Sequence, residues 1–486
     1  MQSLNFLKYS GYSFGRDRFL LVVQKRYRYK KKWAVNLRPK TSCELALDHF
    51  DAFYKPVHGE HWPSIRVALL SLPKYVAIVN NFGDTDSTIQ QLHQLGAVDI
   101  IDSSVKSVTK MESKLLAEIQ ARKEKAETEG GVIDFKDQSQ DQTDHSMGVD
   151  YESKEIDKDN SEDFKTEHLQ NVFTPDTVYN NTDLQYFVPT RQVFSEREAL
   201  LQEEEKMYST YEDRPISVRI LPEHLPALSK TLKVMTFKSG DVSDFPSPRA
   251  NDMGLLNYYL LDGASVLPVL ALEVQPNDSV LDLCAAPGGK TLAMLQLLIT
   301  QGGRLTANDV SYSRIDRLYS VLRSYVPKDL LAALVHVQNK NGKLFNVPAF
   351  DKVLVDVPCN SDRHVLQEED NNLFKPSRIK ERLQLTSLQK DLLMSGRIRS
   401  CKPGGSIVYS TCTLAPAQND GVVQAAVEEL WETSDLDVVV ENLSPLATLL
   451  QPFFKFHKST RLGQLVLPSL VNNFGPMYFC KLKRLR

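Results

Sequence analysis

The fold is decided by residues 279–291, which read Ser279-Val280-Leu281-Asp282-Leu283-Cys284-Ala285-Ala286-Pro287-Gly288-Gly289-Lys290-Thr291. The first residues are mostly apolar and favour a strand, the middle is a turn of small residues, and a helix is expected to begin near Lys290. In doubly wound sheets this layout receives the polar end of a nucleotide-like ligand. Glycine allows close backbone approach, and the free N–H groups of a helix start attract carboxylate or phosphate. The stretch therefore predicts a ligand-binding strand–turn–helix unit.

From Ser279 to the C-terminus strands alternate with helices, which predicts an α/β fold with a parallel sheet and helices on both faces. Further strands are expected at 304–309, 335–338, 351–356, 406–411, 436–440 and 477–482. Helices are expected at 290–300, 311–325, 377–400 and 418–430. Asp309 ends the second strand, where such sheets hold ribose hydroxyls with an acid. The alternative is that Asp309 caps the following helix.

Two cysteines lie just past the ends of expected strands. Cys359 follows Asp356-Val357-Pro358, and Cys412 follows Ser410-Thr411. Ligands of open α/β sheets bind at this carboxyl edge. One cysteine there would be read as structural, but two beside Asp356 and facing a ligand turn indicate thiolate chemistry. The residues alone leave either cysteine as the nucleophile.

Cysteine spacing and hydropathy argue against disulfide-rich, metal-binding and membrane-spanning classes of protein. The six cysteines lie far apart without a CxxC pair, which argues against a disulfide framework or a metal site and favours a reducing compartment. No apolar run is long enough to span a bilayer, so we expect no membrane partner.

The net charge of −3 hides a strong asymmetry along the chain. Residues 1–40 hold eleven Lys/Arg and one acid, which predicts a mitochondrial transit peptide; a basic RNA-contacting arm or nuclear signal is the alternative. Residues 41–120 are expected to form a small, mainly helical region. The segment 121–185 is predicted to be a disordered acidic insertion, because residues 121–170 hold fifteen acids against seven bases without periodicity.

The rest of the chain divides into a connecting region at 186–250 and the catalytic domain at 251–486. The connecting region is expected to hold a strand at 232–237, and residues 254–272, which are apolar with helical spacing, are expected to form a helix.

Three motifs in the catalytic domain resemble those of the Sun (Fmu) family of RNA cytosine-5 methyltransferases. They are Asp282–Thr291, Asp356–Cys359 and Ser410–Cys412, in the family's order. Further stretches resemble the subgroup that acts on mitochondrial ribosomal RNA: 62–66, 79–82, 362–364, 371–375 and 472–481. The resemblance implies a Rossmann-like methyltransferase sheet with S-adenosylmethionine as cofactor and no metal.

The resemblance also assigns a cofactor site. Gly288, Gly289 and Lys290 would lie along the methionine end, Asp309 would hold the ribose with Arg314 nearby, Asn341 and Gly342 would lie at the adenine, and Asp356 would lie between cofactor and base. Asn341 departs from the family pattern, which usually has Asp there. An Asn side chain can still hydrogen-bond adenine but brings no charge.

The same resemblance implies that Cys412 adds to C6 of cytosine, Asp356 steadies N3 and the exocyclic amine, and Cys359 assists elimination.

The resemblance further implies ribosomal RNA of the mitochondrial small subunit as substrate, action in the matrix and in ribosome assembly, and a helical-repeat partner of the mitochondrial transcription termination factor family. The alternative is a non-catalytic assembly factor on a methyltransferase scaffold. The basic residues at 375–382 and 481–486 would contact phosphates or be an ordinary solvated face.

Overall fold

The computed structural model describes residues 38–106, 200–204, 206, 217–222, 226–299, 302–345, 348–394 and 398–486. Nearly all of the predicted transit peptide and all of the acidic insertion lie outside the described residues. The chain divides into two compact units, Met1–Thr41 and Ser42–Arg486, and every element named below belongs to the second.

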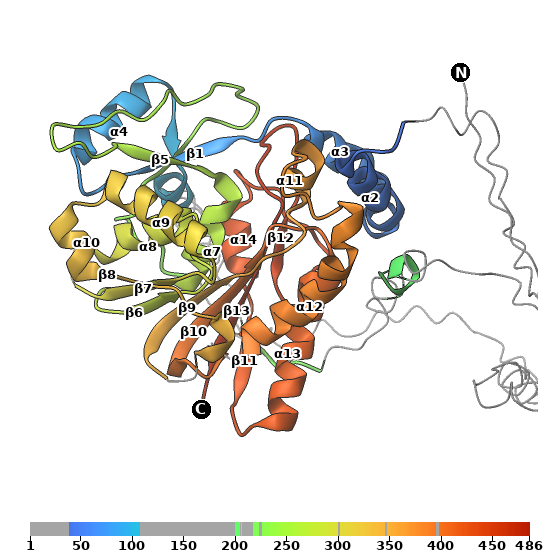
Figure 1. Cartoon of the computed structure of the whole chain (residues 1–486). Coiled ribbons are helices and arrows are strands. Elements are labelled where there is room, and N and C mark those ends of the chain that lie inside the picture. Colours follow the sequence, from blue (N-terminus) through green and yellow to red (C-terminus); the bar gives the residue numbers. More distant parts are fainter. Residues whose placement is uncertain are drawn as a thin grey trace, which may run out of the picture. The chain divides into compact units, whose positions relative to one another are not determined.

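A large, mostly parallel sheet forms the centre of this unit (Figure 1). In sheet order its strands are β3 (Ile220–Leu221), β11 (Val438–Glu441), β13 (Met477–Arg484), β10 (Cys401–Thr411), β9 (Phe350–Asp356), β6 (Ser279–Asp282), β7 (Arg304–Asn308) and β8 (Val335–Gln338), and β12 (Gln464–Val466) pairs with β13 off this path. Strand β13 runs antiparallel to β10 and β11, whereas β8, β7, β6, β9 and β10 are parallel. The strands predicted from 279 onward are confirmed.

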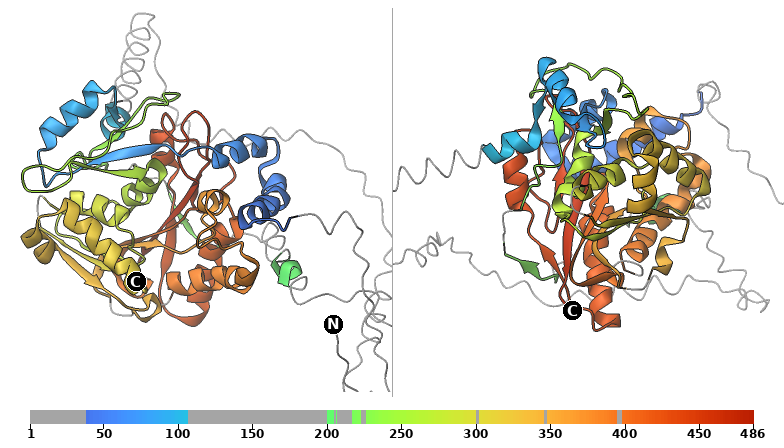
Figure 2. Two further views of the ribbon diagram at one scale, coloured as in Figure 1. Left: turned by 45° about the horizontal axis from the view of Figure 1, so that its top comes forward. Right: turned by 90° about the vertical axis from the view of Figure 1, so that its left-hand side faces the viewer.

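Helices cover both faces of the sheet, as predicted. Neighbouring strand residues pack into two different hydrophobic clusters: Val280 and Leu354 into one, Leu281 and Val353 into the other. Alternation between faces is what a strand's two-residue period requires. The first cluster includes residues of α7 (Leu267–Leu272), α8 (Gly289–Leu298), α9 (Tyr312–Tyr325), α10 (Lys328–Leu334) and α14 (Ser444–Leu450). The second includes residues of α2 (Ser42–His58), α3 (Trp62–Leu70), α11 (Asp362–Gln367), α12 (Ile379–Leu393) and α13 (Asp420–Thr433), and Figure 2 shows the layers from two further sides.

A second, antiparallel sheet stands beside the N-terminal helices. Its order is β2 (Val98–Asp99), β4 (Val234–Thr236), β1 (Tyr75–Val79) and β5 (Tyr258–Asp262), with α4 (Thr85–Gln94) joining β1 to β2. The sheet therefore joins segments from three of the predicted regions, and β5 lies within the segment predicted as the catalytic domain. The region predicted to be mainly helical begins with α2 and α3 and also supplies β1 and β2 to this sheet.

The single helix predicted over residues 254–272 is wrong in its first half. Residues 258–262 form β5, which pairs with all five residues of β1, and only after a 3₁₀ turn does α7 begin, with Pro268 in its first turn. Two tyrosines at the start of β5 favour the extended backbone, and proline favours a helix start. The described helices include none long and apolar enough to cross a bilayer.

The start of α8 packs tightly on β5, which gives a first testable prediction. A Cβ added at Gly289 would meet Leu261 Cδ1 at 2.8 Å and Tyr259 Cε1 at 3.0 Å. We expect Gly289→Ala to lower the free energy of unfolding by about 1–3 kcal/mol through overpacking. Gly83→Ala is the control, because the nearest atom to its Cβ would be the end of the Asn251 side chain, at 3.3 Å, and the Asn80 carbonyl oxygen would lie at an ordinary 3.8 Å. Equal melting temperatures for the two variants would contradict the prediction.

Candidate active site

The turn after β6 lies at the topological switch point of the large sheet. Strand β6 has β7 on one side and β9 on the other, and ligands of such sheets bind beyond the strand ends at this point. Gly288 is the N-cap of α8 with φ of +116°, a backbone conformation that only glycine adopts readily. A Cβ on Gly288 would also meet Leu318 Cδ1 at 2.9 Å. Packing against protein side chains thus accounts for both glycines of the turn.

A cavity of about 450 Å³ opens beside this turn and collects the chemistry-bearing side chains from several strand ends. Five predicted site residues line it: Lys290, Arg314, Asp356, Cys359 and Cys412. The other five do not: Gly288, Gly289, Asp309, Asn341 and Gly342. Larger cavities of about 630 and 870 Å³ occur elsewhere in the described residues and hold none of the ten.

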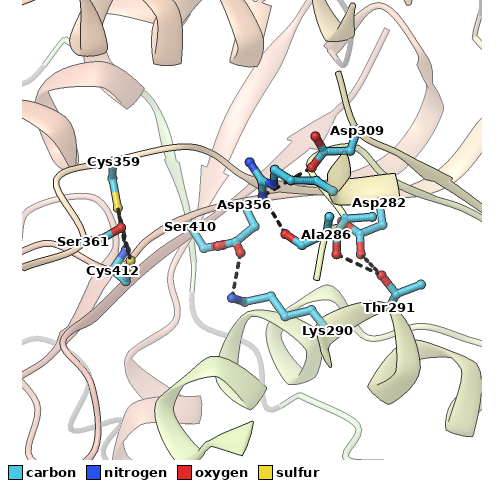
Figure 3. A network of polar contacts seen from close by, with 12 residues as sticks. Asp282, Ala286, Lys290, Thr291, Asp309, Asp356, Cys359, Ser361, Ser410 and Cys412 are labelled. Atoms are coloured by element: carbon cyan, nitrogen blue, oxygen red, sulfur yellow. Dashed lines mark hydrogen bonds and ion pairs between the residues drawn. The ribbon is translucent and has the colours of Figure 1, made fainter. Parts of the chain in front are cut away.

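Asp356 is held from two sides at the end of β9. Lys290 Nζ donates to Asp356 Oδ2 at 2.8 Å, and Ser410 Oγ donates to Oδ1 at 2.8 Å, as Figure 3 shows. Burial alone would lower the pKa of Lys290, but the charge of Asp356 and its hydrogen bond outweigh burial and raise it. Lys290 therefore stays charged, and the carboxylate has a fixed orientation at the cavity wall.

The two cysteines meet in the same cavity. Their sulfur atoms are 3.2 Å apart without a disulfide, and the Cys412 backbone N–H donates to Cys359 Sγ at 3.3 Å. The pKa of Cys359 is raised well above its usual value by its hydrogen bond to Cys412 and by burial. The same hydrogen bond, with help from Ser361 and Lys290, lowers the pKa of Cys412. These contacts favour ionisation of Cys412 over ionisation of Cys359.

Asp309 is buried next to the turn, and among the described residues only one of its carboxylate oxygens accepts a hydrogen bond. Its Oδ1 accepts the backbone N–H of Ser311 at 3.0 Å, so the acid does order the approach to α9. Its Oδ2 accepts no hydrogen bond from the described residues, and Arg314 Nη2 lies 3.3 Å away. Arg314 also donates to the carbonyl of Ala286 at 2.6 Å, which ties the acid to the glycine turn.

The loop that carries Asn341 reaches the same sheet edge. Asn308 at the end of β7 bonds Lys340 in both directions, with its Nδ2 donating to the Lys340 carbonyl at 3.0 Å and its Oδ1 accepting the Lys340 N–H at 2.9 Å. Asn341 itself is exposed, and its side-chain oxygen accepts the N–H of Lys343 at 3.0 Å.

The N-terminal helices brace the segment after Cys412, which the sequence did not reveal. Tyr54 of α2 places its hydroxyl 3.2 Å from Thr413 Oγ1, and Thr413 donates to Asp362 Oδ1 at 2.8 Å. Leu414 N–H donates to the other oxygen of Asp362 at 2.7 Å. Burial raises the pKa of Asp362 to about 7. Ser410 and Ser361 were also missed as site residues, although both stand within three residues of a motif cysteine.

The basic residues considered for phosphate contact are largely engaged within the protein. Arg382 is buried and forms a bidentate pair with Glu204, at 3.0 Å for each bond. Lys481 is 2% exposed and pairs with Glu273 and Glu441. Arg382 and Lys481 form ion pairs within the fold, so the prediction that these two residues contact RNA phosphates is wrong. The described residues include no group of three side chains arranged to hold a metal ion.

Comparison with known proteins identifies the family. The model of the family described as 16S rRNA methyltransferase RsmB/F matches residues 269–451. The mouse 5-cytosine rRNA methyltransferase NSUN4 is 39% identical over 469 residues, covering 95% of this chain and 94% of its own. The Caenorhabditis elegans 5-cytosine rRNA methyltransferase nsun-4 is 33% identical, covering 96% and 97%. The crystal structure of NSun6 from Pyrococcus horikoshii with SFG is 22% identical, with a TM-score of 0.34 over 50% of this chain and 57% of that chain. The chain belongs to the RsmB/F (Sun) family of RNA cytosine-5 methyltransferases.

Proposed function

We propose that this RNA 5-methylcytosine methyltransferase methylates a cytosine of mitochondrial small-subunit ribosomal RNA, with S-adenosylmethionine as donor and Cys412 as nucleophile. The observation that carries the proposal is one cavity lined both by the Cys412 and Cys359 sulfurs, 3.2 Å apart, and by an Asp356 carboxylate fixed by Lys290 and Ser410. The named relatives act on ribosomal RNA according to their names, and the resemblance of the motifs supplies the compartment.

The residues around the turn fit the proposed cofactor. Asp309 is 2% exposed and has a carboxylate oxygen without a hydrogen bond from the described residues, as expected of an acid that receives ribose hydroxyls. Lys290 and Arg314 line the cavity beside it and would hold the methionine end and flank the ribose. When bound, S-adenosylmethionine supplies the electrophilic methyl group. Asn341 Oδ1 accepts the N–H of Lys343, and the NH2 group of the same side chain would donate to a ring nitrogen of the adenine.

The thiol pair suits addition to cytosine followed by elimination. C5 of cytosine is a poor nucleophile until a thiolate adds to C6, when the C5–C6 π electrons become available at C5. The lowered pKa of Cys412 favours the thiolate that forms the S–C6 bond. Asp356 faces the same space and accepts a hydrogen bond from the exocyclic amine as charge shifts toward N3. After C5 is methylated, its proton passes to solvent water, the electrons of the C5–H bond re-form the C5–C6 double bond, and the S–C6 bond breaks to release the Cys412 thiolate. Cys359 lies beside that sulfur to assist.

The base has room to approach from a second cavity. Cys412, Ser361 and His364 line both the first cavity and a neighbouring one of about 370 Å³. The nucleophile thus lies where the two cavities meet, so a base can enter from one and the cofactor occupy the other. A cytosine must leave its stack to reach such a site, so the RNA would be single-stranded or locally opened there.

The proposal extends to compartment and partners. The basic residues 1–40 support import into the mitochondrial matrix, and the family resemblance supports assembly on the small ribosomal subunit with a helical-repeat protein of the mitochondrial transcription termination factor family. Engagement of Arg382 and Lys481 inside the fold leaves fewer basic groups for RNA, which favours a partner that contributes to RNA binding.

Bisulfite sequencing of ribosomal RNA after depletion of the protein tests this function. We expect one cytosine of mitochondrial small-subunit RNA to lose methylation and to regain it with the wild-type chain but not with Cys412→Ala. Recovery of ribosome assembly by Cys412→Ala without methylation would support the non-catalytic assembly factor as an additional role. Unchanged methylation after depletion, or loss confined to cytoplasmic ribosomal RNA, would contradict the proposal.

A further inference from the structure

Ser361 occupies an unusual backbone conformation beside the two thiols. It is the N-cap of α11, with φ of +53° and ψ of +59°, a left-handed geometry that side chains other than glycine rarely adopt. Residues held in such conformations cluster at functional sites, where the surroundings over-determine them. Its conformation therefore marks Ser361 as a candidate for a role at the two thiols.

The neighbours of Ser361 on both sides are fixed by buried hydrogen bonds. Before it, the Asn360 N–H donates to Gln418 Oε1 at 3.3 Å. After it, the Asp362 N–H donates to the Cys412 carbonyl at 3.3 Å, and its carboxylate accepts from Thr413 and from the next backbone N–H. Asn360 and Asp362 are both buried. These contacts tie the segment around Ser361 to the segment that carries Cys412.

The hydroxyl of Ser361 is consequently aimed at the sulfur pair. Its Oγ lies 3.4 Å from Cys412 Sγ and 3.8 Å from Cys359 Sγ, as Figure 3 shows. Ser361 also lines both cavities that meet at Cys412. The nearer sulfur, that of Cys412, donates its thiol proton to the Ser361 oxygen. Once that proton has left, the serine hydroxyl still has its own proton and can donate it to the thiolate.

We propose that Ser361 is a positioning residue that donates its hydroxyl to the Cys412 sulfur and holds it as a thiolate at the junction of the two cavities. This role rests on the proposed function of Cys412 as the nucleophile. The Ser361 proton stays on its oxygen throughout, so no bond to carbon forms or breaks at this residue. The same hydrogen bond stabilises the thiolate again when the S–C6 bond breaks.

The other groups around the Cys412 sulfur do not make this donor redundant. They are Lys290, Asp356 and Cys359 along the first cavity and Asp262, Arg363 and His364 along the second. Of these, Cys359 shares a hydrogen bond with the Cys412 sulfur, as Ser361 does. The charge of Lys290 favours the thiolate and that of Asp356 opposes it. A thiolate at Cys412 would accept hydrogen bonds from both neighbours, and hydrogen bonds to a charged acceptor are the stronger kind.

Two substitutions of Ser361 distinguish the effect of its hydroxyl from the effect of its strained backbone. Ser361→Ala removes the hydroxyl and keeps the strained backbone, whereas Ser361→Gly removes the hydroxyl and relieves the strain. In the full-length protein, iodoacetamide labelling of Cys412, followed by mass spectrometry across pH, reports its ionisation. We expect both variants to raise the midpoint by about one pH unit and to lower kcat by about tenfold, with KM for RNA and cofactor nearly unchanged. Ser361→Thr should restore both, and Ser361→Gly should melt higher than Ser361→Ala.

The outcomes distinguish this role from the function on which it rests. An unchanged Cys412 labelling midpoint in Ser361→Ala and Ser361→Gly overturns the positioning role, whatever happens to kcat. Restoration of kcat by Ser361→Gly alone would show that only the backbone matters, and it overturns the role as well. Full activity of Cys412→Ala would instead remove the proposed nucleophile, while the labelling data would still report whether Ser361 bonds that sulfur.

Discussion

Cys412→Ala is expected to lower methyl transfer to RNA by about 10⁴-fold or more, because removal of a covalent nucleophile leaves only binding and electrostatic effects. Cys359→Ala is expected to accumulate a covalent protein–RNA adduct, since Cys412 can still add to C6 but elimination lacks its partner 3.2 Å away. Transfer of a labelled methyl group measures the first effect. A band of retarded mobility on a denaturing gel, removed by ribonuclease, measures the second.

Cys43→Ala is the matched thiol deletion for this experiment. Cys43 is a free cysteine outside the cavity, and burial together with Glu369 raises its pKa to about 11, so it has no role as a nucleophile. We expect the Cys43→Ala variant to transfer methyl groups to RNA as fast as the wild-type chain. An adduct with Cys412→Ala and none with Cys359→Ala would reverse the two roles. Cys359 would then be the nucleophile, which is the alternative that the residues alone leave open.

The sheet could be predicted from the sequence because its signals are local. Each predicted strand from 279 onward includes apolar residues and is followed by a turn or a helix whose residues are adjacent in the chain, whereas the three-residue β12 was not predicted. The second sheet could not be predicted in this way. Its strand β5 pairs with β1, about 180 residues earlier, so the hydrogen bonds that hold residues 258–262 extended are not visible in their own spacing.

In the site, too, residues at strand ends could be predicted, whereas contacts between residues far apart in the sequence could not. The strand-end rule brought Asp356, Cys359 and Cys412 to one cavity, as predicted. It gave no sign of Tyr54, which reaches the segment after Cys412 from a helix more than 350 residues earlier. The basic residue Arg382 was misjudged for the same reason, since its partner Glu204 lies far away in sequence.

Asp356→Asn is expected to lower kcat by about 10²–10³-fold, the usual cost of losing an aligned electrostatic group in an active site. The amide keeps the size of the carboxylate but loses the charge that Lys290 contacts at 2.8 Å. Without that charge, burial dominates at Lys290 and its pKa falls, so Lys290 loses part of its positive charge at high pH. We therefore expect the activity of the variant to decline with rising pH at a lower value than that of the wild-type chain. Single-turnover methyl transfer across pH, at saturating RNA and cofactor, measures both effects.

Ser410→Ala is the matched variant, because it removes one hydrogen bond from the same carboxylate and leaves its charge and its contact with Lys290 in place. We expect a loss of about tenfold, without the shift in the pH profile. If Asp356 acts through its charge toward the base, the asparagine variant must be much the weaker enzyme. Equal losses in the two variants would mean that the carboxylate only orients the end of β9, and the role assigned to it at N3 and the exocyclic amine would then pass to another group in the cavity.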